Sequence, residues 1–294
     1  MFRGTFTALV TPFRDGGIDF VAFDKLIDAQ ISGGVTGIVA VGTTGESPTL
    51  THDEKQEVVK RAIKSANRRC KVLVGTGTNS TRDSIEATQF AEKAGADGAL
   101  VVAPYYNKPS QEGLFRHFKK IAESTSVPIM LYNIPGRCSV DIAADTVVRL
   151  AEACPNIACI KEASGSVDRV SELRCRLPDK FTILSGDDSL TLPFMSVGAA
   201  GVVSVASNLF PSEVCFLVRA CESGDYNSAQ SQHRKLLPLF KDLFIEPNPV
   251  PAKTALGWRH LMSSEVRLPL CEMSEENQAR LRKTLEAFEK NKSS

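Results

Sequence analysis

The sequence lacks the charge imbalance and the long apolar runs that mark proteins acting on nucleic acids or in membranes. Its 294 residues include 35 Lys and Arg against 34 Asp and Glu, and a net charge of +1 gives no electrostatic argument for either partner. No apolar stretch reaches the length that spans a bilayer, and the first residues have no signal-peptide pattern. These absences predict a soluble cytoplasmic protein with no nucleic-acid or membrane partner.

Common ligand-binding motifs are absent as well. The eight cysteines form no CxxC pair and the four histidines form no HxxxH pair, so the sequence predicts no metal site. The cysteines fit buried thiols in a reducing compartment. No GxGxxG follows the first apolar run, and the glycine-rich stretch 42–47 lacks the Lys and Ser or Thr of a P-loop.

The chain does contain short apolar runs that alternate with longer amphipathic stretches. Such runs are typical of strands that are covered on both faces, as in a parallel sheet. Eight of them occur, at residues 5–10, 37–41, 72–74, 98–102, 129–132, 157–160, 182–184 and 201–205. Eight strand–helix units over about 220 residues match the size of a (β/α)8 TIM barrel. A doubly wound open sheet is the alternative, weakened by the missing dinucleotide motif.

A repeated glycine pattern supports this alternation. The sequence Gly-x-x-Gly precedes an apolar run at residues 34–37, 95–98 and 198–201. The first glycine is expected to end a helix in the left-handed conformation, and the second to lead into a buried strand. The alternation stops near residue 224, after which residues 236–244, 252–262 and 274–291 have helical patterns. We therefore expect a barrel over residues 1–224 and a C-terminal helical domain over residues 225–294.

Lys161 stands directly after the sixth apolar run. In a parallel barrel, side chains at the C-terminal ends of the strands line the mouth of the active site. A lysine amine at that position is partly desolvated, which lowers its pKa and allows it to attack a carbonyl group and form a Schiff base. The alternative is a solvated lysine that caps a strand, as most lysines are exposed.

The loops after other strands supply hydroxyl groups and a carboxylate binder. Thr43 and Thr44 offer hydroxyl and backbone N–H groups that suit a small carboxylate. Tyr106 and Tyr132 are phenols that can relay protons during imine chemistry, and Arg137 can bind a carboxylate through two hydrogen bonds. Together with the lysine, these residues predict imine chemistry on a small 2-oxo acid.

Six stretches, in this order, resemble the dihydrodipicolinate synthase (4-hydroxy-tetrahydrodipicolinate synthase) family, and the resemblance runs nearly end to end. They are residues 41–46, 104–107, 131–137, 160–165, 184–188 and 246–249. The resemblance implies a TIM barrel with a C-terminal helical domain. It also implies a lyase that condenses pyruvate with L-aspartate 4-semialdehyde in the diaminopimelate route to lysine, without a cofactor or a metal.

The resemblance also assigns roles to single residues. Lys161 matches the lysine that forms the Schiff base with pyruvate. Tyr132, Thr43 and Tyr106 match the proton relay, in which the family's counterpart of Tyr106 comes from a neighbouring subunit. A dimer is therefore the minimal active unit that the resemblance implies, and a homotetramer made of two such dimers is expected. Residues matching substrate-binding positions are Thr44 for the pyruvate carboxylate, Arg137 for the semialdehyde carboxylate, and Gly186 and Val203 in the pocket wall.

Members of the family that are inhibited by lysine bind it at a dimer interface. The residues that match this candidate effector site are Ser47, His52, Lys55, Asn79, Asp83 and Tyr105. Lys55 stands where sensitive members carry a histidine, and its cation would repel the ammonium groups of lysine. Pro48 replaces a small residue, and Asp83 is shorter than the usual glutamate. We expect weak or absent inhibition by lysine.

Two other functions stay open at this point. A pyruvate-dependent aldolase or lyase, of the N-acetylneuraminate lyase or keto-deoxy sugar acid type, shares the threonine loop, the tyrosine and the lysine. Arg137 and the Tyr105–Tyr106 pair favour the synthase. The second is a non-catalytic barrel that binds a 2-oxo acid, but such a protein has no need of lysine, tyrosine, threonine and arginine together.

Overall fold

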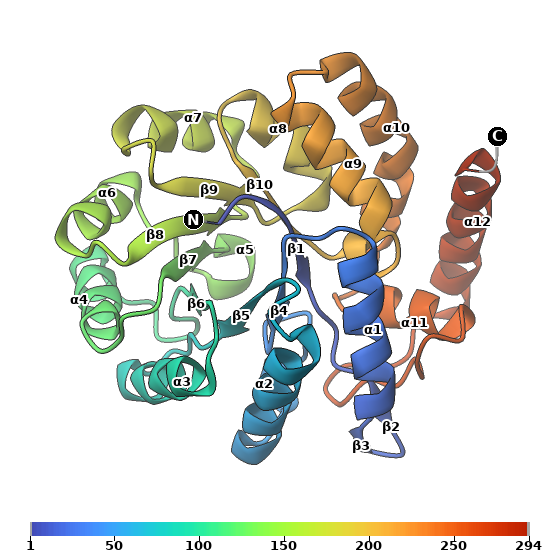
Figure 1. The fold of residues 1–294 in the computed structure, drawn as a ribbon, viewed down its shortest axis with the longest axis horizontal. Coiled ribbons are helices and arrows are strands. Elements are labelled where there is room, and N and C mark those ends of the chain that lie inside the picture. The colour runs from blue at the N-terminus through green and yellow to red at the C-terminus, as the bar shows by residue number, and fades with distance from the viewer. Residues whose placement is uncertain (1, 293–294) are drawn as a thin grey trace.

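The computed structural model describes residues 2–292 of the chain, and the side chains of residues 2–290. Its centre is a closed barrel of eight parallel strands, in the order β1-β10-β9-β8-β7-β6-β5-β4 (Figure 1). The barrel strands are β1 (Gly4–Ala8), β4 (Gly37–Ala40), β5 (Lys71–Gly75), β6 (Gly98–Val102), β7 (Ile129–Asn133), β8 (Ile157–Glu162), β9 (Thr182–Ser185) and β10 (Gly201–Ser204). The sequence prediction of a TIM barrel is confirmed. The open sheet is wrong, because β1 pairs with both β10 and β4.

Helices surround the barrel on its outer side, except for the short α5, which lies inside the ring of helices beside β7 (Figure 1). Those that follow the strands are α1 (Phe20–Ser32), α2 (His52–Ala66), α3 (Thr81–Ala94), α4 (Gln111–Ala122), α5 (Pro135–Cys138), α6 (Ala144–Ala153), α7 (Val167–Arg176), α8 (Thr191–Ser196) and α9 (Pro211–Glu222). A small hairpin of β2 (Phe13–Arg14) and β3 (Gly17–Ile18) precedes α1, and single 3-10 turns occur at η1 (Ser47–Thr49), η2 (Asp188–Leu190) and η3 (Ala206–Asn208). Helix and strand thus alternate as the apolar runs predict.

Local signals in the sequence explain where these elements begin and end. Thr51 and Glu54 form a capping box at the start of α2, each side chain bonding to the other residue's backbone N–H. Gly95 ends α3 with a φ of 95°, as the glycine pattern predicts. The second glycine of this pattern, Gly98, begins β6. A Cβ at this position would lie 2.5 Å from Cζ of Phe2, so the strand packs directly on that ring.

Three further helices form the C-terminal region, α10 (Tyr226–Asp242), α11 (Val250–Trp258) and α12 (Glu275–Lys292). Figure 1 shows them at one side of the barrel, beyond α1 and α9. Helix α10 begins at Tyr226, ten residues before the predicted start at 236. The prediction missed its first turns because they are mostly polar and show no helical spacing of apolar residues. The boundary near residue 224 stays a prediction, and residues 293 and 294 of the expected domain lie outside the described residues.

A buried ion pair joins this region to the barrel. Nζ of Lys253, in α11, lies 2.6 Å from Oε1 of Glu46, and both side chains are buried. The second carboxylate oxygen of Glu46 accepts the backbone N–H of Arg267 at 3.0 Å. Glu46 belongs to the glycine-rich loop after β4, so the C-terminal region supports a loop at the mouth of the barrel. Within residues 2–292, no helix is long and apolar enough to cross a membrane.

Candidate active site

Lys161 lies at the C-terminal end of β8 and is only 6% exposed. It is in register with Tyr132 of β7, and its Nζ lies 4.0 Å from the centroid of the tyrosine ring. The alternative of a solvated strand cap is therefore wrong, because the amine is enclosed against a phenol within the barrel.

This enclosure changes the acid–base behaviour of the amine. Burial lowers the pKa of the Lys161 ammonium to about 7, because the charged form loses its hydration. The carboxylate of Asp188 opposes this shift, and the guanidinium of Arg137 adds to it. At neutral pH much of the amine is uncharged, which is the form that attacks a carbonyl carbon.

Gly186 provides the room that the lysine side chain needs. A Cβ at this position would lie 3.0 Å from Cε and 3.1 Å from Cγ of Lys161, and 2.8 Å from Cβ of Ala163. A larger residue would crowd the lysine side chain and Ala163. Val203, on β10, is buried within the barrel.

Asp188 is a functional candidate that the sequence reasoning missed, since consecutive aspartates after a strand indicate only a helix cap. Asp187 does cap η2, whereas Asp188 is buried and its Oδ2 accepts the N–H groups of Val205 and Ala206 at 2.9 and 3.0 Å. Burial raises the pKa of Asp188 to about 6. The carboxylate is therefore mostly ionised at neutral pH, where it stabilises the ammonium form of Lys161.

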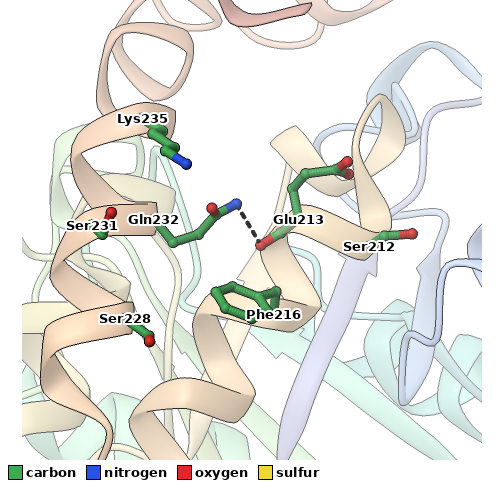
Figure 2. Close-up of a pocket in the computed structure, with 7 residues that line it drawn as sticks. All are labelled: Ser212, Glu213, Phe216, Ser228, Ser231, Gln232 and Lys235. Atoms are coloured by element: carbon green, nitrogen blue, oxygen red, sulfur yellow. Dashed lines mark hydrogen bonds between the residues drawn. The ribbon is translucent and has the colours of Figure 1, made fainter. Parts of the chain in front are cut away.

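A cavity of about 360 Å³ lies elsewhere, between α9 and α10, and is open to the outer surface (Figure 2). Its wall includes Phe216, Gln232 and Lys235, and Nε2 of Gln232 donates to the backbone oxygen of Glu213 at 3.3 Å. None of the predicted site residues lines this cleft. It does not provide the chemistry that the sequence predicts.

The cavity at the barrel mouth, of about 210 Å³, brings together residues from the loops after β4, β5, β6 and β7. Three predicted catalytic or substrate-binding residues line it, Thr43, Tyr132 and Arg137, as do three of the predicted effector residues, Ser47, Lys55 and Tyr105. In the described chain its wall contains two cations, Lys55 and Arg137, and no carboxylate. The cavity therefore suits small anions.

The remaining predicted residues do not line this cavity, Lys161, Gly186 and Val203 included. Thr44 is buried beside it, and its hydroxyl accepts a hydrogen bond from Nδ2 of Asn248 at 2.9 Å. Tyr106 is 89% exposed, with a φ of 73°, and so contributes nothing to the cavity of its own chain. The other effector candidates are also away from the wall: His52, Asn79 and Asp83.

Neither the described side chains nor the sequence offers an obvious metal centre. Within residues 2–290, no group of three or more His, Cys, Asp and Glu side chains is arranged to hold an ion. The side chains in the wall of the mouth cavity include an amine, phenols, hydroxyls and a guanidinium group.

The model of the dihydrodipicolinate synthetase family matches residues 1–288. The chain belongs to this family. A curated relative, the 4-hydroxy-tetrahydrodipicolinate synthase of Endomicrobium trichonymphae, is 51% identical over 98% of this chain and 99% of its own length.

Solved structures of family members share the fold closely. The 4-hydroxy-tetrahydrodipicolinate synthase of Methylacidiphilum fumariolicum SolV is 56% identical, with a TM-score of 0.98 over 99% of this chain and 97% of that one. The dihydrodipicolinate synthase of Aquifex aeolicus is 49% identical, with a TM-score of 0.97 over 98% of each chain. The similarity therefore includes the C-terminal helices as well as the barrel.

The lowered pKa of Lys161 leads to a test in this family member. Imine formation with pyruvate, trapped by borohydride, should increase as the pH rises through about 7, because only the neutral amine reacts. Asp188→Asn removes the charge that favours the ammonium form, so the rise should move to lower pH. Mass spectrometry of the trapped protein gives the rate at each pH. If the pH at which trapping increases is the same in Asp188→Asn as in the wild-type protein, Asp188 does not influence the pKa of Lys161.

Proposed function

We propose that this protein is a 4-hydroxy-tetrahydrodipicolinate synthase, a lyase that condenses pyruvate with L-aspartate 4-semialdehyde in the diaminopimelate route to lysine. The observation that carries the proposal is the buried Lys161 amine, with its lowered pKa, against Tyr132 at the mouth of a barrel of this family. The route is biosynthetic, and we place the enzyme in the cytoplasm.

The first half of the reaction makes a nucleophile from pyruvate. The neutral amine of Lys161 attacks C2 of pyruvate, and the resulting carbinolamine loses its hydroxyl as water to give an imine. Burial keeps the pKa of the Tyr132 phenol above its ordinary value, so that the phenol is protonated and can supply the proton that the leaving hydroxyl needs. The iminium group then withdraws electrons, and the methyl group loses a proton to form an enamine.

The second half joins the two substrates. The enamine carbon attacks the aldehyde carbon of the semialdehyde, whose oxygen takes up a proton and becomes a hydroxyl. The amine of the same substrate then attacks the imine carbon, which closes the ring and releases the Lys161 amine. Thr43 acts with Tyr132 in moving these protons, and its position in the same cavity wall supports this role.

The carboxylates of the two substrates need separate partners. Thr44 binds the carboxylate of pyruvate, with Gly186 and Val203 in the wall of the same pocket. Arg137, at the edge of the cavity, binds the carboxylate of the semialdehyde through its planar guanidinium group. A wall with cations and no carboxylate in the described chain supports this assignment.

Tyr106 completes the proton relay in a neighbouring copy of the chain. Its 89% exposure, outside the cavity of its own chain, supports a role across a subunit boundary. The minimal active unit is then a dimer, and we propose a homotetramer built from two such dimers.

Steady-state turnover with pyruvate and L-aspartate 4-semialdehyde, coupled to a reductase that consumes the cyclic product, tests the proposed function. Turnover with ping-pong kinetics is expected, and Lys161→Ala should abolish both turnover and borohydride trapping of pyruvate. If the protein traps pyruvate without turning over the semialdehyde, its substrate is a longer keto-deoxy acid. If pyruvate is not trapped at all, the protein is a binding barrel and the proposal fails.

Mixing two inactive variants tests the role of Tyr106. Tyr106→Phe should lose about a hundredfold or more in kcat, as expected for removal of a proton-transfer group, while circular dichroism and melting stay unchanged. Subunit exchange with Lys161→Ala should restore part of the activity, because one site of the mixed dimer then has both an intact lysine and an intact tyrosine. Full activity of Tyr106→Phe alone would remove Tyr106 from the relay.

Inhibition by L-lysine should be weak or absent. Lys55 is half-buried in the wall of the mouth cavity, and it adds a cation where a bound lysine would bring its own ammonium groups. Steady-state assays over a range of L-lysine concentrations measure this. Inhibition at micromolar lysine would contradict the expectation, and Lys55→His is the variant in which sensitivity should increase.

A further inference from the structure

Asn248 contacts two of the residues that we propose to bind substrate carboxylates. Its Nδ2 donates to the hydroxyl oxygen of Thr44 at 2.9 Å, and its backbone oxygen accepts from Nη2 of Arg137 at 3.5 Å. Thr44 and Arg137 come from loops after different strands, β4 and β7. A residue of the C-terminal region thus lies between the two halves of the carboxylate-binding site.

The segment around Asn248 is held on both sides. Before it, Oε1 of Glu246 accepts from the backbone N–H of Ser274 at 3.0 Å and from Nδ2 of Asn277 at 2.7 Å. After it, Lys253 forms the buried ion pair with Glu46, which belongs to the same loop as Thr44. The position of the Asn248 amide relative to Thr44 is therefore fixed by the fold.

The hydrogen bond from Asn248 determines what the Thr44 hydroxyl can do. A hydroxyl group has one proton to donate and two lone pairs to accept with. Because the amide N–H of Asn248 occupies an acceptor position, the Thr44 proton must point elsewhere, and among the described residues Thr44 makes no other side-chain hydrogen bond. The proton is left for a group that is not part of the chain, and a substrate carboxylate is such an acceptor.

The side-chain amide of Asn248 also has an oxygen that accepts no hydrogen bond from the described residues. It is buried, and in the described part of the chain its Oδ1 has no hydrogen-bond partner. Buried polar atoms without a hydrogen-bond partner are uncommon in native proteins. Turning the amide over would instead leave Nδ2, which carries two protons, without an acceptor, so the orientation in which Nδ2 donates to Thr44 leaves fewer polar groups unpaired.

We propose that Asn248 is a positioning residue, which orients the hydroxyl of Thr44 so that its proton is donated to the carboxylate of pyruvate. The inference rests on the proposed function, in which Thr44 binds that carboxylate. It predicts an effect on pyruvate binding that is transmitted through Thr44. The contact with Arg137 uses the backbone of Asn248, so side-chain substitutions should leave the KM for the semialdehyde almost unchanged.

A double-mutant cycle tests the proposal. The variants are Asn248→Ala, Thr44→Val and the two combined, and the measurement is the pyruvate concentration that gives half-maximal borohydride trapping on Lys161. Asn248→Ala should raise this concentration about tenfold, as expected for a weakened hydrogen bond to a charged group, with a much smaller change in kcat. In the Thr44→Val variant, Asn248→Ala should cause no further increase in this concentration, because the hydroxyl that Asn248 orients is already absent.

Two further variants separate positioning from general stability. Asn248→Asp keeps the shape of the side chain, but its carboxylate accepts a hydrogen bond from the Thr44 hydroxyl and adds a negative charge, so pyruvate should bind more weakly than to Asn248→Ala. This variant also serves if Asn248→Ala does not fold. Asn156→Ala removes an amide that donates to the backbone oxygens of Ala122 and Thr125, away from Asn248 and Thr44, and should lower the melting temperature without changing half-saturation by pyruvate.

The outcomes distinguish this inference from the proposed function. The positioning role is overturned if the Asn248 variants leave the half-saturating pyruvate concentration unchanged. It is also overturned if they raise this concentration by the same factor with and without the Thr44 hydroxyl. In both cases the synthase assignment stands. A wild-type protein that does not trap pyruvate on Lys161 would overturn both.

Discussion

The desolvation of one amine is the constraint on which the site depends. A lysine at the end of a barrel strand keeps an ordinary pKa if water reaches it, and it is then almost wholly protonated at neutral pH. Closure of the eight strands encloses Lys161, the ring of Tyr132 covers one side, and the missing side chain at Gly186 gives the lysine its place. Together these features bury the amine, and burial lowers its pKa to about 7.

The C-terminal helices are part of the same site. The loop after β4 carries Thr43, Thr44 and Glu46, and it is supported from the far end of the sequence by Lys253 and Asn248. Removing two charges from water is unfavourable unless their remaining hydrogen-bonding positions are satisfied. The backbone N–H of Arg267 does this for Glu46. Both partners of the Glu46 carboxylate therefore come from the C-terminal region.

Sequence reasoning succeeded where the signal is local. Apolar runs located the eight strands to within two residues, and the capping box at Thr51 located the start of α2, because each depends on neighbours in the chain. It failed where the contact joins distant positions. Asp188 and Asn248 lie in stretches that carry the family resemblance, but those stretches do not show which residues they contact, and their partners are 17 and 204 residues away. No periodicity or motif records such contacts, which depend on how the barrel closes.

Arg137 acts electrostatically on Lys161 from the wall of the mouth cavity. Its guanidinium group lines the cavity, and its positive charge lowers the pKa of Lys161, which increases the neutral fraction of the amine. Asp188 acts in the opposite direction, and a pyruvate carboxylate near Lys161 would do so as well, since both favour the ammonium form. The amine must therefore be neutral enough before pyruvate binds for the imine to form afterwards. An exposed lysine with a carboxylate binder beside it would not meet this requirement, because only burial lowers the pKa far enough to leave a neutral fraction once the anion has arrived.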